Sequence, residues 1–154
     1  MDLEQHIREH FESSASTALE TSVAIAAEIL QTARRVVATH EKQGKILICG
    51  NGGSAAAAQH FSAELLCRYQ RERPPLAAIA LSADTATITA TANDYAFEQI
   101  FSRQIHGLAR PGDLLIALTT SGNSPNILEA VKMAADKGRD TVALTGCDGG
   151  DLAG

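Results

Sequence analysis

The chain has 154 residues, the size of one ordinary domain, and hydrophobic residues make up 45% of it, enough for a globular core. Its 13 Lys and Arg against 18 Asp and Glu leave a net charge of −5 without a basic cluster, which argues against a nucleic-acid partner. Three scattered cysteines, no apolar stretch of roughly 20 residues and a charged N-terminus predict a cytoplasmic protein with reduced thiols, no membrane span and no signal peptide.

Two long helices are predicted first. Apolar residues recur at helical spacing over residues 3–20 and 22–43, and Gly44 stands where a helix C-cap belongs. The apolar residues of these two helices form a stripe that is too large for one face of a small sheet to bury. We therefore expect subunits to pack through it.

Short apolar runs then alternate with helical patterns. Runs typical of strands buried on both faces cover residues 45–50, 76–81, 113–119 and 141–145, and helical patterns cover about 54–69, 94–109 and 125–137. The alternation predicts an α/β fold, a three-layer α/β/α sandwich with a parallel sheet. We expect a single domain, with N-terminal helices over 1–43 and a sheet-and-helix core over 44–154. The turn-forming residues 148–154 predict that a further strand and helix follow.

The loop Gly50-Asn51-Gly52-Gly53-Ser54 follows the first expected strand and opens a helix. Ligands of open parallel sheets bind at such helix N-termini, and glycines let the backbone approach an anion closely. The spacing matches neither G-x-G-x-x-G nor the Walker A pattern, which argues against a nucleotide. A plain strand-to-helix turn with Ser54 as N-cap accounts for the same residues.

A second loop, Thr119-Thr120-Ser121-Gly122-Asn123-Ser124, follows the third expected strand. Ser124 is a good N-cap and Pro125 a good first helical residue. Four hydroxyls in six residues could surround a phosphate monoester without a cation, although one such turn can be purely structural. Two loops of this kind on neighbouring strands favour a sugar phosphate or a similar small anion.

Two further pairs have candidate roles. His60 and Glu64 are four residues apart on an expected helix and so share one face, where they could ligate a divalent metal or form a base with its orienting partner. A surface hydrogen bond would use the same spacing. Asn93-Asp94 has the local pattern of a cap for the following helix. The arginines at 68, 71 and 73 indicate a solvated loop.

With these residues considered together, the chain resembles the phosphoheptose isomerase family of the sugar isomerase (SIS) fold. The resemblance runs from the N-terminal helices to Gly154 and rests on several motifs in the same order. They are Cys49-Gly-Asn-Gly-Gly-Ser54, Gln59-His-Phe-Ser-Ala-Glu64, Glu72-Arg-Pro74, Ala92-Asn-Asp-Tyr95, Thr120-Ser-Gly-Asn-Ser124, Leu144-Thr-Gly146 and Asp148-Gly-Gly150.

The resemblance implies an aldose–ketose isomerase that converts sedoheptulose 7-phosphate to D-glycero-D-manno-heptose 7-phosphate through an enediol, towards the heptoses of lipopolysaccharide or other surface glycans. It implies one zinc ion per subunit, held by His60 and Glu64, with Glu64 also contacting substrate as the general base. The family's Gln and His on a C-terminal helix have no counterpart in these 154 residues, and the family is a homotetramer with active sites between subunits. The implied phosphate contacts are Ser54, Thr119, Thr120, Ser121 and Ser124, and the implied polyol contacts are Asn51, Gly52, Gly53, Asn93 and Asp94.

A relative in the same fold is not an enzyme but binds the bacterial replication initiator at the origin, and it shares the first loop. That relative lacks the carboxylate found here at Glu64 and carries Arg in place of Ser121. A third alternative, a sugar-phosphate sensor, would need a DNA-binding domain that these residues do not encode. Glu64 and Ser121 therefore both favour the isomerase over the initiator-binding protein.

Overall fold

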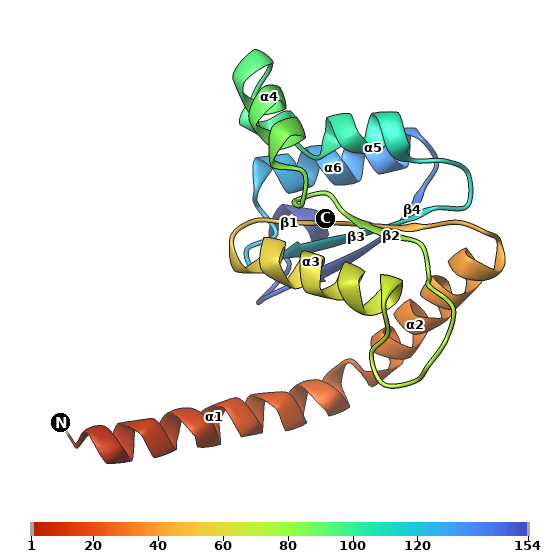
Figure 1. Cartoon of the computed structure of the whole chain (residues 1–154). Coiled ribbons are helices and arrows are strands. Elements are labelled where there is room, and N and C mark those ends of the chain that lie inside the picture. Colours follow the sequence, from red (N-terminus) through yellow and green to blue (C-terminus); the bar gives the residue numbers. More distant parts are fainter. Residues whose placement is uncertain (1, 154) are drawn as a thin grey trace. The chain divides into compact units, whose positions relative to one another are not determined.

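The computed structural model describes residues 2–153, which form two compact units, residues 2–35 and 36–153 (Figure 1). The first unit holds α1 (Leu3–Ala24) and the start of α2 (Ala26–Glu41). The carboxylate of Asp2 caps α1, accepting from the backbone N–H of Glu4 at 3.1 Å. Two helices were predicted here, and the break between them falls at Ile25, a few residues later than expected.

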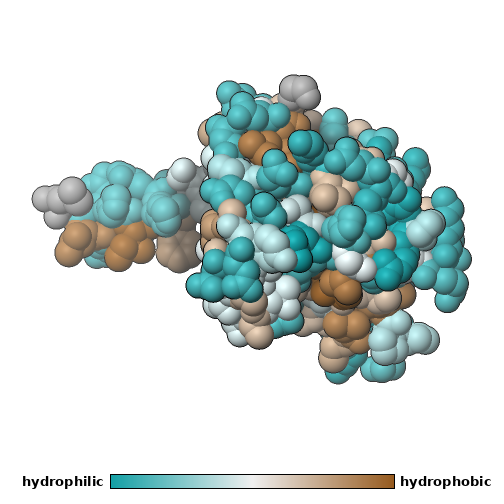
Figure 2. All heavy atoms as spheres, turned by 90° about the horizontal axis from the view of Figure 1, so that it is seen from above, coloured by the Kyte–Doolittle hydropathy of each residue, from teal (hydrophilic) through white to brown (hydrophobic). Residues whose placement is uncertain are grey.

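One side of α1 carries an apolar stripe that nothing in its own unit covers. Figure 2 shows hydrophobic side chains gathered along one side of this helix and hydrophilic ones along the other. Residues at intervals of four or eight make up the stripe, and each is more than half exposed: Leu3, Ile7, Phe11, Leu19 and Val23. None of the helices described is long and apolar enough to cross a membrane.

The second unit is built on a four-stranded parallel sheet of order β2-β1-β3-β4, which confirms the predicted fold class. Helices lie on both faces of this sheet (Figure 1). The strands are β1 (Ile46–Gly50), β2 (Ala78–Ala80), β3 (Leu114–Thr119) and β4 (Asp140–Thr145), and the helices after α2 are α3 (Gly53–Leu66), α4 (Thr85–Asp94), η1 (Phe97–Gln99), α5 (Ser102–Leu108), α6 (Pro125–Asp136) and η2 (Gly150–Ala153).

Alternate residues of the central strands enter two separate cores. Leu47 and Leu115 face the core that holds Phe101 of the α4–α6 side, whereas Ile46 and Ile116 face the core beneath α3. All five residues of β1 are buried. The central strands β1 and β3 are continuous apolar runs because both of their faces are covered, as the sequence predicted. The prediction of a strand buried on both faces is wrong for residues 141–145, because β4 lies at the edge of the sheet and its residues are exposed or half-buried.

The prediction of one helix over residues 94–109 is wrong. The structure has instead α4, η1 and α5, and α4 begins in the threonine-rich stretch that carried no helical prediction. Threonine is β-branched and a poor helix former, but the Asp84 side chain accepts from the backbone N–H of Thr87 at 3.1 Å and from its hydroxyl at 2.6 Å, which starts the helix. Asn93-Asp94 therefore ends a helix and does not cap the next one.

The turn after α2 also differs from expectation. Gln43, not Gly44, takes the left-handed conformation, with φ of 61°. Gly44 is needed for another reason, because a Cβ at this position would overlap the carbonyl oxygen of Gly112. Close backbone approach, and not helix capping, selects glycine here.

A buried ion pair joins the amino ends of β1 and β3. Asp113, 5% exposed, accepts from the Lys45 backbone N–H at 2.9 Å, from Lys45 Nζ at 2.5 Å and from the Arg110 backbone N–H at 2.7 Å. Burial alone would raise the pKa of Asp113, but the hydrogen bonds from Lys45 and Arg110 and the attraction of Lys45 together outweigh it and lower the pKa. The ionised carboxylate thus stabilises the folded state.

We expect Asp113→Asn to remove this contribution. Because the folded-state pKa is depressed, the stabilisation is present above the unfolded pKa, about 4, and is lost as pH falls through the folded pKa. In urea unfolding, the variant should be less stable than the parent at neutral pH and should lose less stability than the parent on acidification. Asp136→Asn, at an exposed carboxylate, is the control. Parallel pH profiles for parent and Asp113→Asn would contradict the assignment.

Candidate functional site

The loops after β1 and β3 meet at the point where the strand order reverses. β2 lies on one side of β1 and β3 on the other, and α3 and α6 cover opposite faces of the sheet. From these loops the chain passes to helices on opposite faces of the sheet, which leaves a crevice at the carboxyl ends of β1 and β3, the usual ligand site of an open α/β sheet. A small cavity of about 50 Å³ lies there, lined by Asn51, Ser54, Leu118, Thr119, Thr120 and Ser124. We call these six residues the cup.

Three hydroxyls of the cup make no hydrogen bond within the described residues: those of Ser54, Thr120 and Ser124. Ser124 occupies the N-cap position of α6, as predicted, yet its side chain caps nothing. The alternative in which Ser54 merely caps α3 is wrong, because Gly52, with φ of 52°, is the N-cap and Ser54 lies inside the first turn. These hydroxyls are available to a ligand.

The other two hydroxyls of the second loop, those of Thr119 and Ser121, make hydrogen bonds within the loop. Thr119 Oγ1 accepts from the backbone N–H of Gly122 at 3.3 Å, and Ser121 Oγ accepts from that of Asn123 at 3.2 Å. A hydroxyl that accepts one bond can still donate, so Thr119, which lines the cup, could also donate to an anion. Ser121 does not line the cup. Its hydroxyl supports the turn.

The glycine-rich segment after β4 braces this loop. The backbone N–H of Gly146 donates to the Thr120 carbonyl at 3.1 Å, and that of Asp151 donates to Asn123 Oδ1 at 2.8 Å. Gly122 has φ of 68°, and a Cβ on it would overlap the carbonyl oxygen of Gly149. Backbone therefore packs directly on backbone, which only glycine allows.

His60 and Glu64 share one face of α3, as their spacing predicted. His60 Nε2 lies 3.5 Å from Glu64 Oε1, with side chains 76% and 29% exposed. At 1.5 Å of rise per residue they lie about 9 Å and 15 Å along the helix from Ser54, so they are not part of the cup. The Arg73 guanidinium ends this helix by donating to the carbonyls of Glu64 and Leu65 at 2.7 and 2.8 Å, so its expected place in a solvated loop is wrong.

Comparison with known proteins decides the family. The SIS domain family matches residues 9–146 of the chain. A phosphoheptose isomerase of Aromatoleum aromaticum is 53% identical over 152 residues, which cover 99% of this chain and 77% of the relative. The chain belongs to the phosphoheptose isomerases, within the SIS-domain proteins.

Solved phosphoheptose isomerase structures have the same fold. That from Neisseria gonorrhoeae is 43% identical, with a TM-score of 0.92 over 98% of this chain and 79% of its own. That from Francisella tularensis is 47% identical, with a TM-score of 0.94 over 99% of this chain and 80% of its own. The expected fold is therefore confirmed independently of the strand pattern.

For a phosphoheptose isomerase, the described residues supply only part of the expected metal site. His60 and Glu64 could give one nitrogen and one oxygen ligand, whereas a catalytic zinc takes three protein ligands. Residues 2–153 contain no group of three His, Cys, Asp or Glu that could hold a metal ion. These residues alone do not complete a zinc site.

Asn93 and Asp94 lie at the end of α4, away from the cup's lining. Asn93 Nδ2 donates to Asp94 Oδ1 at 2.8 Å, and Asp94 borders a second hollow of about 420 Å³. That hollow is also lined by Tyr95 and Arg103, whose guanidinium lies 3.7 Å from the Tyr95 ring centre. The described chain does not bring this pair together with the two loops in one cavity.

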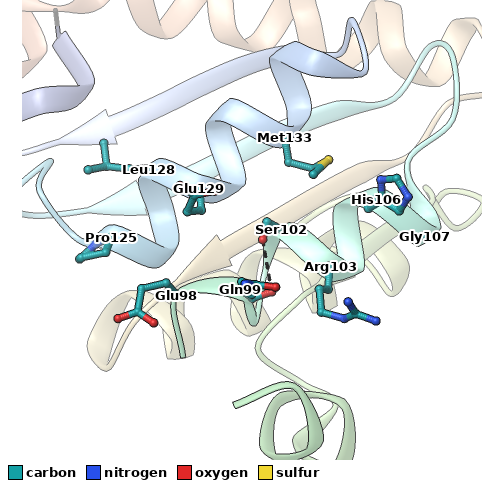
Figure 3. Close-up of a pocket in the computed structure, with 10 residues that line it drawn as sticks. All are labelled: Glu98, Gln99, Ser102, Arg103, His106, Gly107, Pro125, Leu128, Glu129 and Met133. Atoms are coloured by element: carbon teal, nitrogen blue, oxygen red, sulfur yellow. Dashed lines mark hydrogen bonds between the residues drawn. The ribbon is translucent and has the colours of Figure 1, made fainter. Parts of the chain in front are cut away.

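A larger hollow, of about 730 Å³, lies between α6 and the η1–α5 segment (Figure 3). Two carboxylates, Glu98 and Glu129, and two basic side chains, Arg103 and His106, border it beside apolar Met133. The only bond drawn among these residues is from Ser102 Oγ to the Gln99 carbonyl, at 3.3 Å. None of the residues that line this hollow comes from a strand, whereas the cup is lined by the end of β3 and by the loops after β1 and β3, so the cup remains the better candidate.

We expect Ser124→Ala to weaken anion binding by the cup. A hydrogen bond to a charged group contributes about 1.5 kcal/mol or more, so the Kd for inorganic phosphate should rise about tenfold in isothermal titration calorimetry. Ser102→Ala, which also removes one serine hydroxyl, should leave the Kd unchanged. An unchanged Kd for Ser124→Ala would show that phosphate binds elsewhere.

Proposed function

We propose that this protein converts sedoheptulose 7-phosphate to D-glycero-D-manno-heptose 7-phosphate, an aldose–ketose isomerisation towards the heptose of lipopolysaccharide and other surface glycans. The observation that carries the proposal is the cup, with three uncommitted hydroxyls at the switch point of the sheet. Its six lining residues are uncharged, so it offers neutral donors to one small anionic group. The identity to named isomerases favours this function over initiator binding.

In this proposal the phosphate group anchors the substrate in the cup. Ser54, Thr120 and Ser124 would donate to its oxygens, with Thr119 able to add a fourth donor. The carbon chain then leaves the cup, so the carbonyl lies well away from the phosphate. Binding energy gained at this remote group holds the reacting carbons in place, which lowers the entropic cost of proton transfer.

Glu64 is the proposed base. It would remove a proton from C1, beside the C2 carbonyl, to give an enediol, and would return a proton to C2, while the hydroxyl proton moves from O1 to O2. No atom is gained or lost in the exchange. The Glu64 side chain is partly exposed, so substrate can reach it, and His60 lies close enough to orient the carboxylate.

We also propose that His60 and Glu64 are two ligands of one divalent metal ion, Zn²⁺, per subunit, and that the enzyme is a cytoplasmic homotetramer. The i, i+4 pair supports the first proposal, and the exposed stripe of α1 supports self-association. The exposed thiols of Cys67 and Cys147 fit a reducing compartment.

Glu64→Gln should strongly slow the turnover of sedoheptulose 7-phosphate, which is measured by phosphorus NMR. General-base catalysis contributes about 10²- to 10⁴-fold, so we expect a loss of at least about 100-fold in kcat. Glu98→Gln, at an exposed carboxylate, is the matched control. A chelated sample run in parallel tests the metal. No turnover by the metal-replete product of the intact gene would exclude the isomerase.

Phe11→Glu should dissociate the oligomer. It places a charge in the middle of the apolar stripe, where desolvation on association would be costly. Light scattering after gel filtration should give a smaller mass than for the parent, and Glu12→Gln, at the neighbouring position, should leave the mass unchanged. A parent that is already monomeric would contradict the proposed tetramer.

A further inference from the structure

Asn126, the second residue of α6, is 2% exposed, and its side chain meets that of Asn51 in the first loop. Asn126 Nδ2 donates to Asn51 Oδ1 at 2.8 Å, and Asn51 Nδ2 donates to Asn126 Oδ1 at 2.8 Å. We propose that Asn126 is a positioning residue for phosphate binding: through this reciprocal amide pair it fixes the first loop against the second. The inference rests on the proposed function in taking the cup as the phosphate site.

The pair lies close to the uncommitted hydroxyls on both loops. Asn126 is two residues beyond Ser124, and Asn51 is three residues before Ser54. The Asn51 carbonyl also accepts from the backbone N–H of Ser54 at 2.9 Å and from that of Ala55 at 3.2 Å. A continuous set of hydrogen bonds therefore runs from Asn126 through Asn51 to the turn that carries Ser54.

The reciprocal geometry allows only one relative orientation of the two amides. Turning either amide alone by half a turn would set N–H against N–H and oxygen against oxygen. Each amide has two N–H groups and two oxygen lone pairs, and the pair uses one of each. Asn51 lines the cup, so its second N–H and second lone pair remain for a ligand. Through this pair Asn126 holds the Asn51 amide in place beside the cup.

The pair is better explained by orientation than by stability. A buried hydrogen-bonded pair contributes little more to folding than apolar groups of the same shape would, but leaving one partner unpaired is costly. Apolar side chains at both positions could fill the same space. They could not hold the amide of Asn51 at a defined angle beside the cup. We therefore expect ligand binding to depend on Asn126 more strongly than folding does.

The first test is Asn126→Ala in the full chain, with inorganic phosphate as the probe in calorimetry and the heptulose phosphate in kinetics. The Kd for phosphate and the KM should both rise about tenfold or more, with a smaller fall in kcat. Asp113→Asn is the matched control, since it removes buried hydrogen bonds at the opposite end of the same strands. It should lower the Tm and leave the Kd and KM unchanged.

The second test is Asn126→Asp, which keeps the size of the side chain. Ionised, the new carboxylate accepts from Asn51 Nδ2 but cannot donate to Asn51 Oδ1, and it repels the anion. Protonated, it donates through O–H and restores the reciprocal pair. The ratio of its phosphate Kd to that of the parent should therefore fall as the pH is lowered from about 7.5 to about 5, because burial raises a carboxyl pKa into this range.

The outcomes separate this inference from the proposed function. A parent-like Kd and KM for Asn126→Ala with a lower Tm, or a pH-independent ratio for Asn126→Asp, would overturn the positioning role. A parent that binds phosphate but does not isomerise the heptulose phosphate would overturn the proposed function and leave the positioning test readable. A parent that does not bind phosphate would contradict both.

Discussion

The site depends on the pairing of β1 with β3, the two central strands, whose following helices cover opposite faces of the sheet. Five residue pairs hold them in register, from Ile46 with Leu114 to Gly50 with Leu118. The ion pair of Lys45 with Asp113 joins the strands at their amino ends, and the amides of Asn51 and Asn126 join the loops at the other end. A shift in the register of β1 and β3 would separate the hydroxyls of the cup. The position of the hydroxyls that would bind an anion therefore depends on the pairing of these strands.

The cup has no charged side chain among its lining residues. Hydroxyls and the N-termini of α3 and α6 supply donors and partial positive charge at the position where a phosphate monoester would lie. The glycine-rich segment after β4 closes against the second loop by backbone contacts that a Cβ would prevent. In the proposed isomerase, the phosphate end of the substrate would thus be held between loops that are braced by backbone contacts, and the carbon chain would extend from the cup.

The proposed base and the cup are separated along α3. Glu64 and His60 lie on the same helix as Ser54 but one to three turns further along it, and the described residues supply two of the ligands that a zinc site needs. An active site between subunits would bring further groups to this helix face, and the uncovered stripe of α1 gives the chain a surface through which to associate. Association and catalysis would then be linked.

Sequence alone determined whatever depends on neighbours in the chain: the two central buried strands, the helix after Ser124, and the shared face of His60 and Glu64. It failed where tertiary or unusual local contacts decide. The threonine-rich α4 begins because Asp84 caps it, and Gly52 replaces Ser54 as a cap because the backbone there takes a positive φ. Asn126 carried no signal, since its partner is 75 residues away and only the parallel register of β1 and β3 brings the two amides within hydrogen-bonding distance.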